Sequence, residues 1–300
     1  MTLYAPRYYK DFVCIADKCR HSCCVGWEID VDHDALSRYA TLGTSEGDAI
    51  LRSIDREGTP HFRLTAEERC PHLDERGLCR IISSLGEGYL CDICREHPRF
   101  YNDLPHGREV GIGMVCEEAC RLILTAPDHV LVENGRVKGR ARKADFDALA
   151  YREGILALLW DESIPYTERL ARIACAHDIC LTVADDDEYR ALLSSLEYMH
   201  EANRTRFAAF SADIATPKVI EPWVLRALSY FVYRHVSAAK NEEDARCALG
   251  FALFCERLLA SLAKKEGGLA LPDFCTLART VSEELEYSEE NTESIAFSFF

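Results

Sequence analysis

The sequence predicts a mostly α-helical protein, with an irregular, cysteine-rich, metal-binding N-terminal part followed by an α-helical bundle. Ten of the fifteen cysteines lie in the first 120 of 300 residues, in a stretch interrupted by many glycines and prolines, which favour turns. Beyond about residue 116, apolar residues recur at the spacing of amphipathic helices. We therefore expect a cysteine-cluster metal-binding domain over residues 1–125 and an α-helical domain over residues 126–300.

The composition is that of a folded, water-soluble chain, with 48% hydrophobic and 28% charged residues. A net charge of −15 argues against nucleic-acid or membrane-surface partners, which need a concentrated positive face. The first residues carry charges and Pro6 where a secretory signal would need an apolar run. We expect a cytoplasmic protein, in which clustered thiols stay reduced and bind metal more often than they form disulfides.

The second part of the chain contains segments with helical periodicity. The segments predicted to be helical are 117–126, 143–162, 166–184, 221–240, 243–265 and a last one around 272–286. Five further cysteines lie at apolar helical positions and are expected to be packing residues: Cys175, Cys180, Cys247, Cys255 and Cys275.

The N-terminal cysteines occur in groups separated by turn-forming residues. The groups are Cys14, Cys19, Cys23 and Cys24; Cys70 and Cys79; Cys91 and Cys94; and Cys116 and Cys120. Sharp turns let several thiolates converge on one ion or cluster, so we interpret the groups as a metal site rather than as disulfides or chance. Ten thiols exceed the four that one zinc ion or one [4Fe–4S] cluster takes. The spacing leaves zinc and iron–sulfur equally open, and it allows either two sites or several packing cysteines.

Three strings carry a family resemblance: APRYYKDFVCIADKCRHSCCVGWEIDVD, CPHLDERGLCRIISSLGEGYLCDICREHPRFYN and GMVCEEACRLIL. They resemble the flagellin lysine-N-methylase (FliB) family, within the wider cysteine-cluster (YkgJ-like) group. LSYFVYRHV at 228–236 is similar to the family's C-terminal half, so the likeness covers most of the chain.

The resemblance implies methyl transfer from S-adenosylmethionine to the ε-amino groups of lysines on flagellin, the implied protein partner. It also implies a cysteine-ligated iron–sulfur cluster, [4Fe–4S], for which zinc is the alternative metal. The cysteines in the matching strings, and hence the implied ligands, are Cys14, Cys19, Cys23, Cys24, Cys70, Cys79, Cys94 and Cys116. Cys91 and Cys120 depart from the family pattern, and Glu117 stands where that pattern has a proline.

The cofactor site is less well marked than the cysteine cluster. The sequence has no strand, glycine-rich loop and helix of the Rossmann kind, and GIG at 111–113 is a lone glycine pair. Arg95 and Arg99 could pair with an anionic cluster or with the cofactor carboxylate, or form surface salt bridges instead. Trp27 could cover an apolar site. These three are the predicted cofactor-binding residues, and no catalytic residue is identified.

A second function is compatible with the same cysteines. A zinc- or iron-binding scaffold, or a redox protein, could dock a partner through its helical half without catalysing a reaction. Such a protein needs the metal site but neither S-adenosylmethionine nor a proton acceptor.

Overall fold

The structure is a computed structural model that describes residues 1–139, 143, 145–179, 186–211, 216–267 and 270–298. The chain divides into two compact units, one formed by Val13–Arg99 and the other by Met1–Phe12 together with Phe100–Phe300. Residues 1–12 and 100–125, which we assigned to the cysteine-cluster domain, thus fall in the larger unit. The physical reason is strand pairing, because the first strand of the chain joins a sheet with strands from beyond residue 100.

The smaller unit is built from short elements joined by turns. Its elements are η2 (Ala16–Lys18), α1 (His33–Thr41), α2 (Ser45–Arg52), β2 (Ile54–Asp55), β3 (His61–Phe62), α3 (Arg80–Leu85), η3 (Glu87–Tyr89) and α4 (Asp92–Glu96). Asp32 caps α1, because its Oδ1 accepts a hydrogen bond from Ala35 N at 2.8 Å. Its Oδ2 accepts one from Asp92 N at 2.7 Å and so ties α1 to the start of α4.

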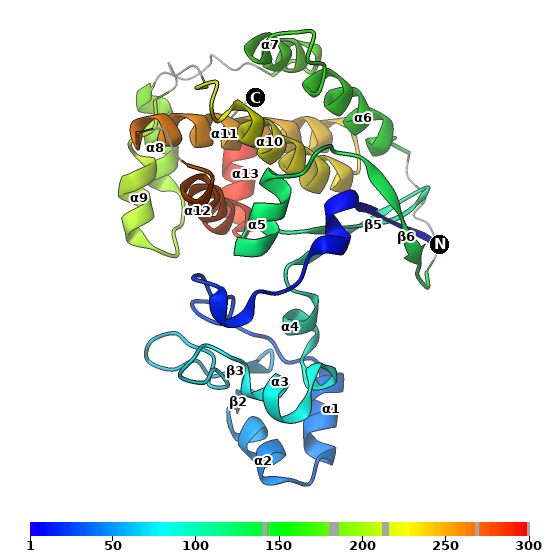
Figure 1. The fold of residues 1–300 in the computed structure, drawn as a ribbon, viewed down its shortest axis with the longest axis vertical. Helices are drawn as coiled ribbons and strands as arrows, with labels where there is room; N and C mark the ends of the chain where they lie inside the picture. The colour runs from blue at the N-terminus through cyan, green and yellow to red at the C-terminus, as the bar shows by residue number, and fades with distance from the viewer. Residues whose placement is uncertain (140–142, 144, 180–185, 212–215, 268–269, 299–300) are drawn as a thin grey trace. The chain divides into compact units, whose positions relative to one another are not determined.

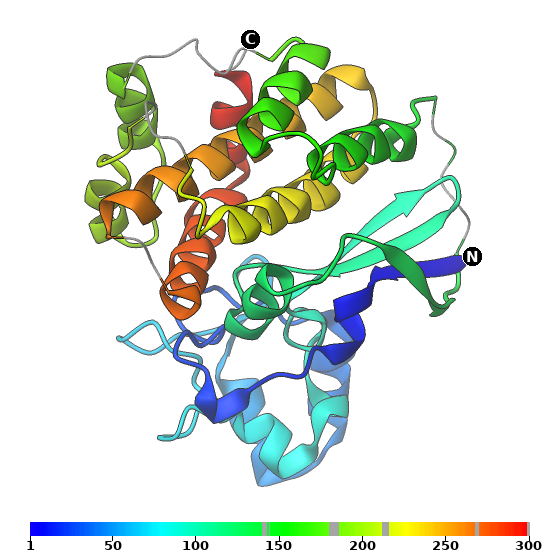
Figure 2. The same ribbon diagram turned by 45° about the horizontal axis from the view of Figure 1, so that its top comes forward.

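A four-stranded sheet lies in the larger unit. Its strands are β1 (Thr2–Pro6), β4 (Arg99–Leu104), β5 (Gly107–Ile112) and β6 (Leu131–Arg136), in the order β4-β5-β1-β6. β1 runs parallel to β5 and antiparallel to β6, and Figure 2 shows it between them. Sequence analysis missed this sheet, because the sequence pattern carries no signal for pairing between residues so far apart in the chain.

Helices make up the rest of the larger unit (Figure 1). They are η1 (Arg7–Asp11), α5 (Glu117–Leu124), α6 (Ala148–Leu159), α7 (Tyr166–Ala176), α8 (Asp186–Ser195), α9 (Glu201–Phe207), α10 (Glu221–His235), η4 (Val236–Ala238), α11 (Glu242–Lys265), α12 (Leu271–Val281), the π-helical turn η5 (Ser282–Glu286) and α13 (Glu289–Phe297). The two longest, α10 and α11, lie side by side. Their buried Phe231, Phe251 and Phe254 belong to the main core of this unit.

The predicted helices agree with α5, α10, α11 and α12 and are too long for α6 and α7. Part of the segment predicted over 166–184, including Cys180, lies outside the described residues. Cys255 and Cys275 are buried as expected, whereas Cys175 is exposed on α7. Among the described helices, none is both long and apolar enough to cross a membrane.

A buried ion pair joins the sheet to the helices. Arg152 on α6 binds Glu109 on β5 with two hydrogen bonds of 2.6 and 3.1 Å, and both side chains are almost fully buried. The same guanidinium donates to Ser237 Oγ at 2.6 Å, in η4. The two hydrogen bonds between the guanidinium and the carboxylate, together with the one to Ser237, compensate both buried charges. The pair therefore holds β5, α6 and η4 together.

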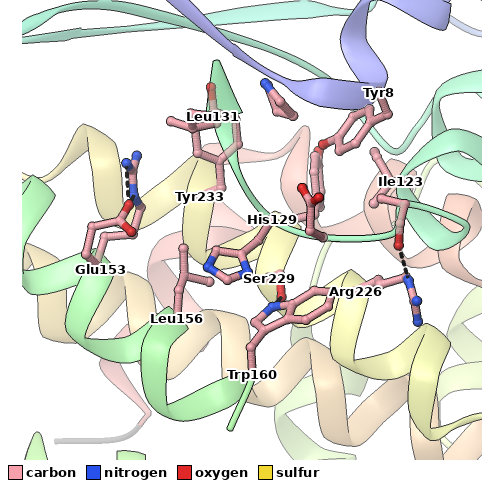
Figure 3. Close-up of a pocket in the computed structure, with 15 residues that line it drawn as sticks. Tyr8, Ile123, His129, Leu131, Glu153, Leu156, Trp160, Arg226, Ser229 and Tyr233 are labelled. Carbon is pink, nitrogen blue, oxygen red and sulfur yellow. Dashed lines mark hydrogen bonds and ion pairs between the residues drawn. The ribbon is translucent and has the colours of Figure 1, made fainter. Parts of the chain in front are cut away.

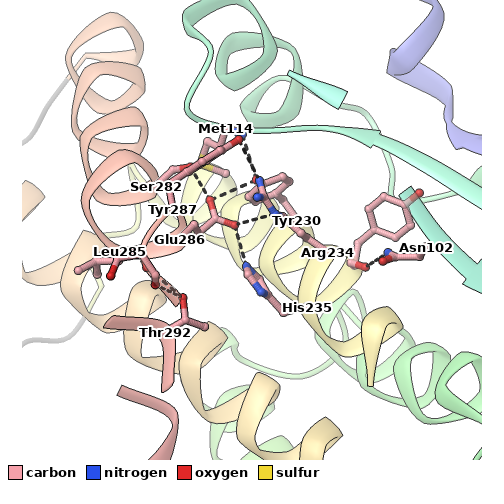
Figure 4. A network of polar contacts seen from close by, with 12 residues as sticks. Asn102, Met114, Tyr230, Arg234, His235, Ser282, Leu285, Glu286, Tyr287 and Thr292 are labelled. Atoms are coloured by element: carbon pink, nitrogen blue, oxygen red, sulfur yellow. Dashed lines mark hydrogen bonds and ion pairs between the residues drawn. The ribbon is translucent and has the colours of Figure 1, made fainter. Parts of the chain in front are cut away.

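A second buried carboxylate, Glu286, organises the contact of α10 with η5 (Figure 4). It accepts hydrogen bonds from Tyr230 at 3.2 Å and from Ser282, and it lies 2.8 Å from His235 Nε2. Burial raises the pKa of Glu286, but the nearby Arg234 and His235 outweigh burial and hold that pKa below its usual range. The π-helical turn places this carboxylate among its partners.

The glycines of the larger unit provide a matched stability test. A Cβ added to Gly111 would lie 2.2 Å from the Phe100 ring, whereas one added to Gly154 in α6 would meet nothing within 4 Å. We expect Gly111→Ala to lower the free energy of unfolding by about 1–3 kcal/mol through overpacking. Gly154→Ala should raise it by about 0.5–1 kcal/mol through helix propensity. Urea unfolding measures both, and equal effects of the two substitutions would contradict this packing.

Glu256 on α11 should make stability depend on pH. It is fully buried, with Tyr166 OH at 3.0 Å and Thr216 Oγ1 at 3.4 Å, and burial raises its pKa from 4.5 to about 7. The folded protein therefore binds a proton more tightly than the unfolded chain. Protonated Glu256 therefore contributes to the free energy of unfolding. This contribution is complete below about pH 4.5 and is lost as the pH rises to 7, so the free energy of unfolding falls by about 3 kcal/mol.

The side chain at position 256 of the Glu256→Gln variant cannot titrate. The free energy of unfolding of this variant should therefore not show the fall that Glu256 causes in the wild type. The measurement is the free energy of unfolding of both proteins between pH 5 and pH 8. If the variant loses stability over this range as steeply as the wild type does, the assignment to Glu256 is wrong.

Candidate functional site

Five thiols share the core of the smaller unit. Cys70 and Cys91 are buried in this core, and Cys24, Cys79 and Cys94 pack against it, partly buried. Ile29, Tyr39 and Phe62 are among the apolar side chains around them. Segments that are distant in the sequence thus bring together cysteines from three of the predicted groups.

Turns position these cysteines as the glycine-rich and proline-rich pattern predicts. In the loop between Cys70 and Cys79, Asp74 Oδ1 accepts hydrogen bonds from the backbone N–H groups of Arg76 at 2.9 Å and Leu78 at 2.8 Å. Gly77 has a φ of +77°, a conformation that glycine adopts without strain. Cys70 N also donates to Cys24 O at 2.8 Å, which joins the first two groups.

The sulfurs of Cys91 and Cys94 lie 3.3 Å apart. Two thiolates on one tetrahedral zinc ion, each at about 2.3 Å from the metal, lie about 3.8 Å apart. The pair therefore needs only a small adjustment to bind one metal centre together. Cys91 is absent from the predicted ligands, although the spacing of two residues between it and Cys94 was the available signal.

The surroundings of the thiols affect their ionisation in opposite directions. Hydrogen bonding by Cys23 lowers the pKa of Cys24 to about 7, and contact with Cys94 lowers the pKa of Cys91. Burial raises the pKa of Cys70 to about 12 and also raises that of Cys79. Some of these thiols therefore ionise more easily than others. A bound cation would offset the free-energy cost of forming thiolates at the buried cysteines.

In the part of the chain that the structure describes, no three Cys, His, Asp or Glu side chains converge closely enough to hold one metal ion. The donor chemistry fits a thiolate-bound metal, but the sulfurs are not gathered around one point. A [4Fe–4S] cluster is larger than a single ion, so its four thiolates need not converge so closely.

The other predicted ligands lie outside this core. Cys14 and Cys23 are exposed, and Cys19 Sγ lies 3.2 Å from the carbonyl oxygen of its neighbour His21. Cys116 belongs to the larger unit, where it precedes α5. Their role as ligands stays a prediction.

The predicted cofactor-binding residues have local partners. Arg95 forms ion pairs with Asp92 and, at 3.5 Å, with Glu96, and its side chain is 43% exposed. The Arg99 guanidinium donates to the carbonyl oxygen of Arg95 at 3.3 Å, and Trp27 is partly exposed. Arg95 thus forms the surface salt bridges that we considered as the alternative to a contact with the cluster or the cofactor. Gly111 of the GIG string has a packing reason of its own, the nearby Phe100 ring.

The larger unit contains a pocket that sequence analysis did not find (Figure 3). Helices α6 and α10, the start of η1 and the segment between α5 and β6 supply its walls, so no single stretch of sequence marks it. Its polar and aromatic lining includes Tyr8, His129, Glu153, Trp160 and Tyr233. The water-accessible space is about 30 Å³, which is room for about one water molecule. S-adenosylmethionine would need several hundred Å³.

Curated relatives match part of the chain. It is 29% identical over 135 residues to the flagellar biosynthetic protein FliU of Salmonella muenchen, a match that covers 43% of this chain and 80% of FliU. It is 29% identical over 137 residues to a lysine-N-methylase of Salmonella typhimurium, and 28% identical over 135 residues to one of Salmonella choleraesuis. Each of these two matches covers 43% of this chain and only 34% of the lysine-N-methylase, about a third of its length.

No family model matches the chain, and no solved structure matches it. The curated matches nevertheless agree with the resemblance found in the cysteine strings. Over the matched part of its length, this chain is similar to two proteins named lysine-N-methylase and to the flagellar biosynthetic protein FliU.

Proposed function

We propose that this chain is an S-adenosylmethionine-dependent protein-lysine N-methyltransferase that acts on flagellin. The observation that carries the proposal is the match to two lysine-N-methylases. The remaining relative, FliU, is named as a flagellar biosynthetic protein, and this name supports flagellin as the substrate. Because the match spans a third of each lysine-N-methylase, activity and substrate both need a direct test.

The proposal includes an iron–sulfur cluster held in the smaller unit. The thiols whose packing in one core supports this role are Cys24, Cys70, Cys79, Cys91 and Cys94. Such a cluster, when bound, supplies an iron site for the amino and carboxylate groups of the cofactor, or one-electron chemistry. The buried thiols support a metal of either kind, because their ionisation needs a nearby positive charge.

Methyl transfer sets clear demands on the protein. The bond from the methyl carbon to the cofactor sulfur breaks, a bond to the lysine nitrogen forms, and the sulfur leaves as a neutral thioether. The nitrogen must be unprotonated to attack, although a lysine in water has a pKa of about 10.4. The enzyme must therefore bind the amine where a proton acceptor and a dry surface favour its neutral form.

The cofactor would bind without a nucleotide-binding unit of the Rossmann kind. Within the described residues, the sheet order β4-β5-β1-β6 is not that of a doubly wound parallel sheet. Arg95, Arg99 and Trp27 stay our proposed cofactor contacts. Arg95 would have to exchange its carboxylate partners for the cofactor.

The direct test is methyl transfer by anaerobically purified protein. Incubation with flagellin and S-adenosylmethionine should add mass in steps of one methyl group per lysine, detected by mass spectrometry of the intact substrate. Flagellin whose lysines are acetylated beforehand is the control and should gain nothing. Protein with its full metal content that neither binds the cofactor nor modifies flagellin would contradict the proposal.

Metal content after removal of one thiol tests the cluster. Cys91→Ser should lower the bound iron and acid-labile sulfide severalfold, because the buried pair with Cys94 is broken. Cys175→Ser is the matched control, since Cys175 is exposed in the larger unit, and it should change neither. About one zinc per chain without sulfide would instead favour the non-catalytic scaffold.

A further inference from the structure

The thiols of Cys91 and Cys94 are close enough to react with each other. Their sulfurs lie 3.3 Å apart, whereas a disulfide bond joins two sulfurs at about 2.05 Å. Cys91 directly precedes α4 and Cys94 lies within it, so one turn of the chain carries both. A C-x2-C turn of this kind is the arrangement that thiol–disulfide oxidoreductases use. The sulfurs need to approach by only about 1.3 Å to bond.

Contacts with α1 hold the backbone on both sides of Cys91. The guanidinium of Arg38 donates to Leu90 O, directly before Cys91, at 2.9 Å. The backbone N–H of Asp92, directly after Cys91, donates to Asp32 Oδ2 at 2.7 Å. Because this backbone is already fixed, bond formation requires movement of the two side chains only.

The two cysteines differ in their access to solvent. Cys94 is partly exposed, whereas Cys91 is 1% exposed. A small oxidant such as hydrogen peroxide therefore meets the Cys94 sulfur first. Cys91 is screened from direct attack, and its sulfur reacts with its neighbour instead.

The same two sulfurs cannot bind a metal and each other at once. Two thiolates on one metal ion lie about 3.8 Å apart, and a disulfide brings them to about 2.05 Å. The observed separation of 3.3 Å lies between these values. The thiolate is the form that binds metal, and a disulfide has no thiolate to offer. The metal-bound and disulfide forms of this pair therefore exclude one another.

We propose that hydrogen peroxide converts Cys91 and Cys94 to a reversible disulfide, and that this disulfide closes the thiol site of the smaller unit to metal. The disulfide itself follows from the position of the two sulfurs. Its effect on metal binding rests on the metal centre that the proposed function includes.

The oxidation is balanced with peroxide as the acceptor of two electrons. The Cys94 thiolate attacks a peroxide oxygen, an S–O bond forms, the O–O bond breaks, and the departing hydroxide takes up the thiol proton as water. The Cys91 thiolate then attacks the Cys94 sulfur, the S–S bond forms, and the S–O bond breaks. The second hydroxide takes up the Cys91 proton as water. Two thiols are oxidised to one disulfide, and peroxide is reduced to two water molecules.

Tryptic digestion separates this pair from every other thiol of the chain. Cleavage after Arg80 and Arg95 releases residues 81–95, which contain Cys91 and Cys94 and no further cysteine. The full chain, freed of metal with a chelator, is treated with an equimolar amount of hydrogen peroxide and then with iodoacetamide. The peptide should carry no alkyl group and weigh two hydrogens less than its reduced form. Dithiothreitol should restore both alkylation sites.

Zinc binding by the wild type tests the effect on the metal site without any substitution. The peroxide-treated chain should bind zinc severalfold more weakly than the reduced chain does, because two thiolates are lost. Reduction by dithiothreitol, followed by its removal, should restore the affinity. A disulfide in the 81–95 peptide together with unchanged zinc affinity would overturn the proposed competition.

Cys79→Ser is the matched control for the pair. Cys79 packs against the same core and is partly buried, as Cys94 is, so this variant should still form the disulfide in the 81–95 peptide. Cys91→Ser should not form it, and dimedone should trap its Cys94 as a sulfenic acid. The wild-type peptide carries the main result, so misfolding of a variant does not affect it.

The results also separate the disulfide from methyl transfer. A wild-type peptide that keeps both alkyl groups after peroxide, or a disulfide between other cysteines in its place, overturns the proposal even if the chain methylates flagellin. A reversible disulfide and weaker zinc binding in a chain that does not methylate flagellin support the proposal and contradict the proposed function.

Discussion

The buried ion pair between Glu109 and Arg152 is the interaction on which the larger unit depends most. It links a central strand of the sheet to α6 and, through Ser237, to the turn after α10. Removing either partner would leave a charge in the interior, which typically costs about 3–5 kcal/mol. The same guanidinium lies on the Tyr233 ring, so one contact both holds the layers together and orients a wall of the pocket.

The smaller unit has a different constraint, a core to which five cysteines contribute. Its helices have only five to nine residues, and cysteines form a large part of its core. Short helices are only marginally stable without strong tertiary contacts. A metal centre on these thiols would supply such contacts and would also compensate their charge.

Some of the candidate sites could be predicted from the sequence and others could not. The C-x2-C spacing and the turn residues around Cys70 and Cys79 predicted that these thiols would gather, and Cys24, Cys70, Cys79 and Cys94 do share one core. The family pattern omitted Cys91, although its spacing of two residues from Cys94 was a signal, and the fold places the two sulfurs 3.3 Å apart. His129 and Tyr233 carried no signal at all, because a histidine in a loop and a tyrosine on an apolar helix face are ordinary features of a sequence.

The sequence by itself determined the mostly helical character of the second part, the positions of α5, α10, α11 and α12, and the grouping of the N-terminal cysteines. These features follow from local periodicity and turn chemistry, which depend on neighbouring residues. Only the tertiary structure decided that residues 1–12 and 100–125 belong to the larger unit, and that Glu109 faces Arg152. It alone brought four segments together around one small pocket. Such contacts join residues tens to more than a hundred positions apart, and hydrogen bonding and burial select them only when the whole unit folds.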